Sequence, residues 1–214
     1  TNGCQFVSIN NCVVTLNRTN NAAGTAPMVD GSTGILSANS TATAAITVIT
    51  VTSSAGTNSN NSFYNNTIQN CNTGIALIGY AAASPFSLAD QNNDIGGTTI
   101  ASGNRVLNFG GATGATVAAA GIRTLAQYGL NVSYNTINNN DGSGFNHETT
   151  IRGIYINAAT SAASDITNNI ITLKISATIS TITEIENESG STDVGNEENI
   201  SNNTITNCSY TTAT

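Results

Sequence analysis

Short alternations of apolar and polar residues, separated by polar turns, run along the whole chain, and one of them recurs. Residues 66–70 read NTIQN, with the apolar anchor Ile68 between two asparagines. Similar segments surround five further anchors: Ile9, Val106, Ile137, Ile171 and Ile205. The last four gaps are 38, 31, 34 and 34 residues, which is typical of a repeat protein. The first gap, 59 residues, leaves room for one more copy, which residues 41–52 would have to supply.

Other positions keep a constant distance from the anchors. An apolar residue stands five positions earlier at Phe63, Val132, Ile166 and Ile200. Asparagine occupies a first position at Asn66, Asn104, Asn135, Asn169 and Asn203, and a second at Asn11, Asn70, Asn108, Asn139 and Asn207. Asparagine tolerates left-handed turn conformations, and asparagines stacked in register form ladders of side-chain amides. Their constant phase therefore predicts successive turns stacked on one another.

A second strand type follows several copies, at residues 34–36, 74–77, 121–125 and 153–156. Alternation places its isoleucine and leucine side chains on one face and Ala76, Arg123 and Tyr155 on the other. Strands this short also fit an antiparallel sandwich, but a sandwich does not require successive turns to be alike. We therefore expect an all-β fold, a right-handed parallel β-helix (a solenoid) of about seven rungs with irregular loops, the hand following from the preference of parallel crossovers.

Composition narrows the classes of partner. Only 8% of the residues are charged, against about 25% in an average protein, and the formal net charge is −7. No cluster of the five basic residues could neutralise phosphates, so no nucleic acid is expected as a partner. No apolar run approaches the roughly 20 residues of a membrane helix, so no membrane insertion is expected. A surface of Asn, Thr and Ser with one lysine is typical of an extracellular protein.

The four cysteines fit the repeat better than a disulfide framework. Cys12, Cys71 and Cys208 each follow the same Ile-x-Asn pattern, and Cys4 corresponds in phase to Phe63. Cys71 and Cys208 would lie four rungs apart, which is too far for a disulfide. We interpret all four as small buried apolar side chains. The sequence contains no CxxC motif, so nothing in the cysteine spacing indicates a zinc or redox site.

The repeat N-x-[I/V]-x-N followed by G-I-x-[L/I] resembles that of parallel β-helices in bacterial surface proteins and polysaccharide-degrading enzymes. Residues 94–99, 121–124 and 131–144 resemble segments of very large secreted proteins of Bacteroidota, similar to those of Flavobacterium. Those proteins are exported by the type IX secretion system, and some act as gliding or adhesive filaments. The resemblance implies that residues 1–214 form a single β-helix segment, an excerpt of a much longer chain. Neither end has room for a polar cap, which supports the same expectation.

The resemblance also implies the partners: the rest of its own longer chain, the secretion machinery and surface polysaccharide. The first hypothesis is a non-catalytic structural or adhesive segment of a secreted cell-surface protein. The alternative is a polysaccharide-binding or polysaccharide-degrading module, assisted by calcium. Exposed tyrosines could stack on sugars or simply lie partly buried under loops: Tyr80, Tyr128 and Tyr155.

Candidate chemistry is sparse. His147 lies beside Glu148 with Arg152 close behind, and a base next to a carboxylate can transfer protons, although a lone histidine in a polar loop is more often a capping residue. The other acids occur in no paired-carboxylate motif of glycoside hydrolases: Asp30, Asp90, Asp94, Asp141, Asp165 and the group within residues 184–198. The sequence therefore assigns no catalytic, cofactor-binding or metal-binding residue and predicts no enzyme.

One group of acidic residues is a candidate calcium site. Glu184, Glu186 and Glu188 alternate along a strand and would share one face, with Asp193, Glu197 and Glu198 following. Such oxygen-rich groups can bind calcium, although a solvated acidic edge that prevents aggregation is the favoured interpretation. The enzyme alternative requires Glu184 or His147 to lie in a groove beside a second carboxylate.

Overall fold

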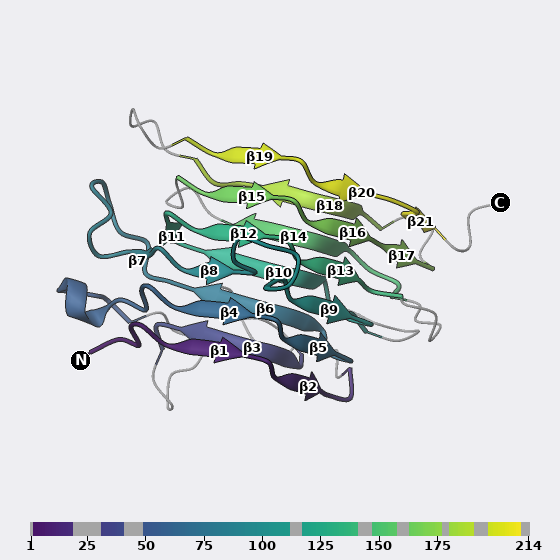
Figure 1. Cartoon of the computed structure of the whole chain (residues 1–214), viewed down its shortest axis with the longest axis horizontal. Helices are drawn as coiled ribbons and strands as arrows, with labels where there is room; N and C mark the ends of the chain where they lie inside the picture. Colours follow the sequence, from purple (N-terminus) through teal and green to yellow (C-terminus); the bar gives the residue numbers. More distant parts are fainter. Residues whose placement is uncertain are drawn as a thin grey trace.

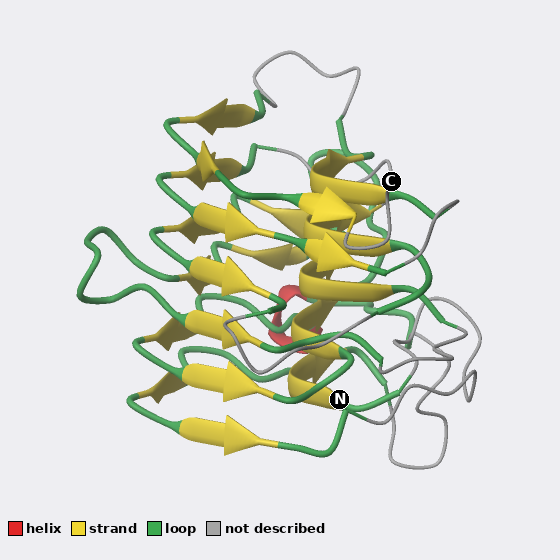
Figure 2. Ribbon diagram, turned by 90° about the vertical axis from the view of Figure 1, so that its right-hand side faces the viewer, coloured by secondary structure: helices red, strands yellow, loops and turns green. Residues whose placement is uncertain are grey.

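The protein is a parallel β-helix, seen here in a computed structural model that describes residues 2–18, 31–40, 49–111, 117–140, 147–157, 163–176, 180–190 and 197–210. Three parallel sheets run along the stack (Figures 1 and 2). In stacking order, sheet 1 contains β1 (Ser8–Asn10), β4 (Ser62–Tyr64), β8 (Asp94–Ile95), β12 (Asn131–Ser133), β15 (Asp165–Thr167) and β19 (Asn199–Ser201). Sheet 2 contains β2 (Val13–Thr15), β5 (Thr67–Gln69), β9 (Arg105–Leu107), β13 (Thr136–Asn138), β16 (Ile170–Thr172) and β20 (Thr204–Ile205).

Sheet 3 contains β3 (Thr33–Ala38), β6 (Thr73–Ile78), β10 (Ala119–Leu125), β14 (Ile151–Asn157) and β18 (Ile182–Asn187). Two small pairs complete the strands, β7 (Asp90–Gln91) with β11 (Gln127–Tyr128) and β17 (Lys174–Ile175) with β21 (Ser209–Tyr210). A single turn of 3-10 helix, η1 (Ser54–Gly56), precedes β4. The chain climbs from β1 at the bottom of Figure 1 to β19, β20 and β21 at the top.

Stacked aliphatic side chains fill the interior. Isoleucines pair in register along sheet 3, from Ile35 to Ile185, and the anchors Ile68, Val106 and Ile137 pair along sheet 2. These three anchors are completely buried. Each such side chain stabilises the fold by about 1.5–3 kcal/mol through burial. The inward-facing isoleucines of sheet 3 and the phase of these three anchors are therefore confirmed. Leu36 was placed wrongly, because it pairs with Ala76 on the outer face and is 46% exposed.

The space between sheets 2 and 3 is narrow enough to require glycine. A Cβ atom built on Gly74 would lie 2.3 Å from Cγ1 of Val106, and one on Gly121 would lie 2.6 Å from Cγ2 of Ile137. The glycines that open each G-I-x-[L/I] segment are therefore required by the packing of one sheet against the other.

The first predicted asparagine position forms the expected ladder. In every rung from Asn104 to Asn203, Oδ1 accepts hydrogen bonds of 2.9–3.1 Å from the backbone N–H and from Nδ2 of the ladder asparagine one rung earlier. Nδ2 of each ladder asparagine also donates, over 2.7–2.9 Å, to a backbone carbonyl of the preceding rung. Asn104, Asn135 and Asn169 are completely buried, so the ladder satisfies polar groups that water does not reach.

The first rung differs from its predicted alignment. Ile9 pairs with Phe63 in sheet 1, and it is Val14 that pairs with Ile68. Cys12 therefore occupies the ladder position, where its backbone N–H donates to Oδ1 of Asn66. Because Cys12 interrupts the asparagine pattern, the alignment predicted from the sequence is wrong by five residues in this copy.

The number of rungs also differs. β1 pairs directly with β4, so no rung lies between the first and second copies. Among the described residues, sheets 1 and 2 each contain six strands, one fewer than the roughly seven rungs expected. Of residues 41–52, those numbered 41–48 lie outside the described part of the chain.

Asparagine at the second position has more varied roles than expected. Asn70, Asn108 and Asn207 have the positive φ expected of a left-handed turn, at 56°, 49° and 57°. Asn11 belongs to another turn, equivalent to that of Asn65. Asn139 instead bonds the backbone of Lys174 in the next rung, accepting from its N–H and donating to its carbonyl.

Candidate functional site

The outer face of sheet 3 carries a group of neighbouring charged and aromatic side chains. Arg123, Tyr155 and Glu186 occupy the same register position on β10, β14 and β18. Parallel strands place such residues about 4.8 Å apart, one per rung. Arg123 and Tyr155 thus point away from the apolar interior, as predicted, and so does Ala76, although Ala76 is completely buried.

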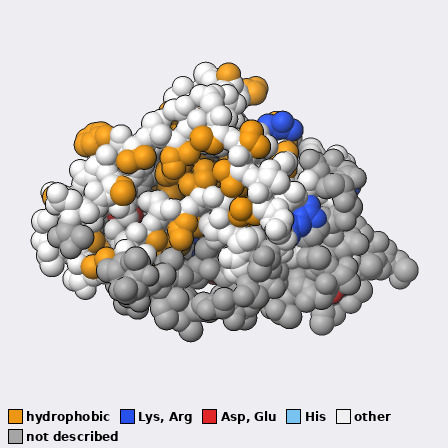
Figure 3. Space-filling view, turned by 90° about the horizontal axis from the view of Figure 1, so that it is seen from below, with side chains coloured by type: hydrophobic (Ala, Val, Ile, Leu, Met, Phe, Trp, Pro, Cys, Tyr) orange, Lys and Arg blue, Asp and Glu red, His pale blue; other side chains and the backbone are white. Residues whose placement is uncertain are grey.

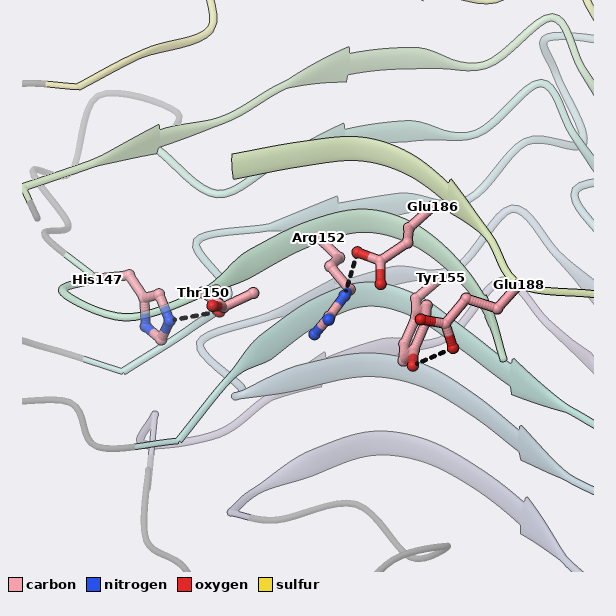
Figure 4. A network of polar contacts seen from close by, with 6 residues as sticks. All are labelled: His147, Thr150, Arg152, Tyr155, Glu186 and Glu188. Carbon is pink, nitrogen blue, oxygen red and sulfur yellow. Dashed lines mark hydrogen bonds and ion pairs between the residues drawn. The ribbon is translucent and has the colours of Figure 1, made fainter. Parts of the chain in front are cut away.

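Figure 4 shows four side chains of this face close together: Arg152, Tyr155, Glu186 and Glu188. Arg152 donates from Nε to Oε2 of Glu186 over 2.6 Å, in a pair whose side chains are both 21% exposed. Its guanidinium carbon lies 4.3 Å from the ring centroid of Tyr155, and that of Arg123 lies 6.0 Å away. The Tyr155 hydroxyl donates to Oε2 of Glu188 over 2.9 Å. We call these five residues the Arg–Tyr–Glu cluster.

The electrostatics of the cluster follow from these contacts. The hydrogen bond from Arg152 lowers the pKa of Glu186 below its usual value, so this carboxylate stays ionised. Partial burial raises the pKa of Tyr155, and the hydrogen bond to Glu188 raises it further, so the phenol stays protonated. A small hollow of about 80 Å³ lies beside the two arginines and Tyr155, over Thr73 and residues 118–120. The cluster thus offers guanidinium donors, carboxylate acceptors and an aromatic ring beside one hollow.

His147 has a structural position. It is completely buried, its Nδ1 accepts from the N–H of Gly111, and its Nε2 donates to the carbonyl of Thr150, both over 3.0 Å. A carbonyl can only accept, so the proton is on Nε2. Burial lowers the pKa of His147, which favours the neutral ring. The histidine therefore ties β-helix loops together and does not line a groove beside a carboxylate.

The three alternating glutamates do not share one face. Glu184 takes the position that Gly153 has one rung earlier, and its carboxylate lies near the thiol of Cys208, where burial, followed by this carboxylate, raises the thiol pKa. Glu186 and Glu188 belong to the outer cluster. The prediction was wrong because strict alternation is interrupted at the glycine position. Gly153 faces Ile171 in the interior, and the next residue, Ile154, is completely buried there as well, so Glu184, which pairs with Gly153, also turns away from the outer face.

No group of three or more His, Cys, Asp or Glu side chains in the described part of the chain has the arrangement of a metal site. Asp193 lies outside that part, as do Asp30 and Asp141. Asp94 and Asp165 lie on the outer face of sheet 1, where each accepts a hydrogen bond from the asparagine of the next rung.

The sequence did not predict the structural role of Asp90. It is 1% exposed, and its Oδ1 accepts from the N–H of Asn58 and from Nδ2 of Asn39, over 2.8 and 3.0 Å. Burial raises its pKa to about 6. Asn58, Asp90 and Gln127 lie in successive rungs and form a second column of buried polar side chains. The sequence indicated this column only through scattered asparagines.

The cysteines are only partly as expected. Cys71 is completely buried, and Cys208 is partly buried. Cys4 and Cys12 are exposed, because they belong to the first rung and have no rung beneath them among the described residues. All four are free thiols. Of the other tyrosines proposed for sugar stacking, Tyr128 packs its ring on Phe86 with a centroid distance of 5.1 Å, and Tyr80 packs against the same small apolar group.

No helix in the described part of the chain is long and apolar enough to cross a membrane. No protein-family model, no curated protein and no solved structure matches the chain.

Proposed function

We propose that the chain is a non-catalytic structural or adhesive β-helix segment of a secreted, extracellular cell-surface protein, of the kind that Bacteroidota export by the type IX system. The observation that carries this proposal is the amide ladder from Asn66 to Asn203, which bonds every rung to the next parallel to the stack axis. A rod whose rungs are joined side chain to side chain suits a load-bearing stalk.

The positions of the reactive side chains support a structural role. His147 has both ring nitrogens bonded to backbone groups in the interior, and Asp90 accepts from two donors there. In both cases the side chain satisfies the fold's own polar groups.

An antibody against this chain tests the proposal. On unpermeabilised cells of its source it should label the surface, and in a blot it should detect a polypeptide much longer than 214 residues. Labelling only after permeabilisation would refute the surface assignment. A band near the size of this chain would refute the longer protein.

The Arg–Tyr–Glu cluster favours a second candidate function, binding of an acidic polysaccharide. Guanidinium groups bind carboxylates through paired hydrogen bonds, and the ring of Tyr155 can contact a sugar face. Titration with polyuronates and neutral glucans, with and without calcium, should show uronate binding that Arg152→Ala weakens. Arg105→Ala removes the same charge from an exposed position on sheet 2 and is the matched control. Equal binding by both variants would reject the cluster as the site.

A further inference from the structure

The two ends of the amide ladder differ. Each interior ladder asparagine donates from its backbone N–H and from Nδ2 to one Oδ1 in the following rung. The acceptor therefore always lies on the C-terminal side, and the donors on the N-terminal side. The last rung of such a stack therefore has unused N–H donors. At the first rung, by contrast, an asparagine in the ladder position would have an unused acceptor oxygen.

At the C-terminal end the donors remain. Nδ2 of Asn203 donates only to the carbonyl of Ile166, over 2.7 Å, and within the described chain neither its second hydrogen nor the Asn203 N–H has an acceptor. The N–H of Asn202 also remains unbonded there, whereas the equivalent N–H of Asn168 donates to the carbonyl of Ser201 in the next rung. We number the described rungs by the strands of sheet 1, from β1 in rung 1 to β19 in rung 6. The unbonded groups of rung 6 repeat the pattern by which rung 5 bonds to rung 6.

Two backbone carbonyl groups at the C-terminal end also lack the hydrogen bonds that their equivalents one rung earlier receive. The carbonyl of Asn169 accepts from the N–H of Thr204, and the carbonyl of Ile166 accepts from Nδ2 of Asn203. The equivalent carbonyls in rung 6 are those of Asn203 and Ile200, which receive no such bonds from a following rung. A strand with asparagine in the ladder position would satisfy all of these groups at once.

Apolar surface supports the same occupant. Ile200 and Ile205 are 44% and 50% exposed, whereas their equivalents one rung earlier, Ile166 and Ile171, are completely buried. A further strand with aliphatic residues at these two positions would bury them, which supplies a driving force for binding.

The N-terminal end presents apolar surface too. Apolar side chains gather on the face seen from below in Figure 3, and Phe6 and Val13 of the first rung are 77% and 73% exposed. The ladder position there is held by Cys12, whose side chain has no amide oxygen. An asparagine in a strand below it would therefore place its donors against a thiol, whose sulfur is a much weaker acceptor than an amide oxygen, which is unfavourable once they are buried.

We propose that the C-terminal end of the stack, and not the N-terminal end, binds an extended polypeptide segment of the repeat type as a seventh rung. The segment carries asparagine at the ladder position, an aliphatic residue three positions before it, and a β-branched aliphatic residue two positions after it. It adds in parallel to β19 and β20, which is strand addition at an exposed sheet edge.

A synthetic peptide of residues 131–140 tests this, because it contains Val132, Asn135 and Ile137 in the required spacing. Fluorescence anisotropy with the labelled peptide should show one binding site per chain. Hydrogen exchange should show protection of the Asn202 and Asn203 amides. The same peptide with Asn135→Ala should bind at least about tenfold more weakly. Absence of binding at millimolar peptide, or protection of rung 1 instead, would overturn the proposal.

Two variants of the protein distinguish binding through the ladder hydrogen bonds from nonspecific binding of the peptide. Asn203→Asp keeps the acceptor for Asn169 and replaces Nδ2 by a carboxylate oxygen, so it removes both the free donor hydrogen and the bond to the carbonyl of Ile166. It should weaken peptide binding about tenfold or more. Asn10→Asp makes the same exchange at the exposed first rung and should leave binding unchanged. If Asn203→Asp unfolds rung 6, Cys12→Asn still decides the question, since it supplies the missing acceptor and should raise the stoichiometry from one peptide to two. An unchanged stoichiometry would overturn the role of the ladder.

Discussion

Replacing Asn135 by alanine removes the middle of the amide ladder at a position that water does not reach. The substitution leaves two buried donors of Asn104, its backbone N–H and one hydrogen of Nδ2, without their acceptor at 3.1 and 2.9 Å. It also removes the donor to the carbonyl of Ile95, 2.9 Å away. An unsatisfied buried polar group costs about 1–3 kcal/mol, so the two donors alone predict a loss of about 2–6 kcal/mol in the free energy of unfolding.

Asn203→Ala is the matched control, because it removes the same two acceptor bonds, here from Asn169. Asn203 is only partly buried and lies in the last described rung. Truncating its side chain therefore lets water reach the two donors of Asn169, and the expected cost is about 1 kcal/mol. Urea unfolding measures both values, and hydrogen exchange of the Asn104 amide reports whether the loss is local. Equal destabilisation by the two variants would refute the idea that burial makes the ladder strong.

Three further predictions concern packing, pH and thiol chemistry. Gly121→Ala should lower the stability by about 1–3 kcal/mol in thermal unfolding, because its Cβ would lie 2.6 Å from Cγ2 of Ile137; an unchanged melting temperature would contradict the narrow interior. Burial raises the pKa of Asp90 to about 6, so its protonated form favours folding, and that contribution is complete below about pH 4 and lost as the pH rises through about 6. Stability should fall by roughly 3 kcal/mol across this window, and by clearly less in Asp90→Asn; parallel curves would contradict this. Iodoacetamide should spare Cys71, whose pKa burial raises to about 12, while it modifies the exposed thiols of Cys4 and Cys12; equal rates would contradict the burial.

Residues that face the interior were largely predictable. Ile68, Val106 and Ile137 were identified by spacing alone, and the structure pairs them in register. The ladder of Asn66 to Asn203 was predictable for the same reason. Parallel in-register stacking gives each rung the same environment, so it requires the same residue type at the same phase.

Two alignments failed where the chain departs from the period. Cys12 stands at a ladder position, which shifted the first copy and placed Ile9 wrongly. Ile95, the partner of Phe63 and Val132 in sheet 1, was missed. Residues 96–103 separate it from Asn104, so that it precedes its anchor by eleven residues instead of five.

The sequence by itself determined the period, the strand faces and the asparagine ladder, because these depend on alternation within a strand and repetition between rungs. Only the tertiary structure decided what the charged side chains do. Loops of unequal length set which residues meet across rungs, so the contact of Arg152 with Glu186, 34 residues away, follows from register and not from any local pattern. The interrupted alternation at the glycine position likewise turned Glu184 toward Cys208. Burial of His147 made it a structural residue.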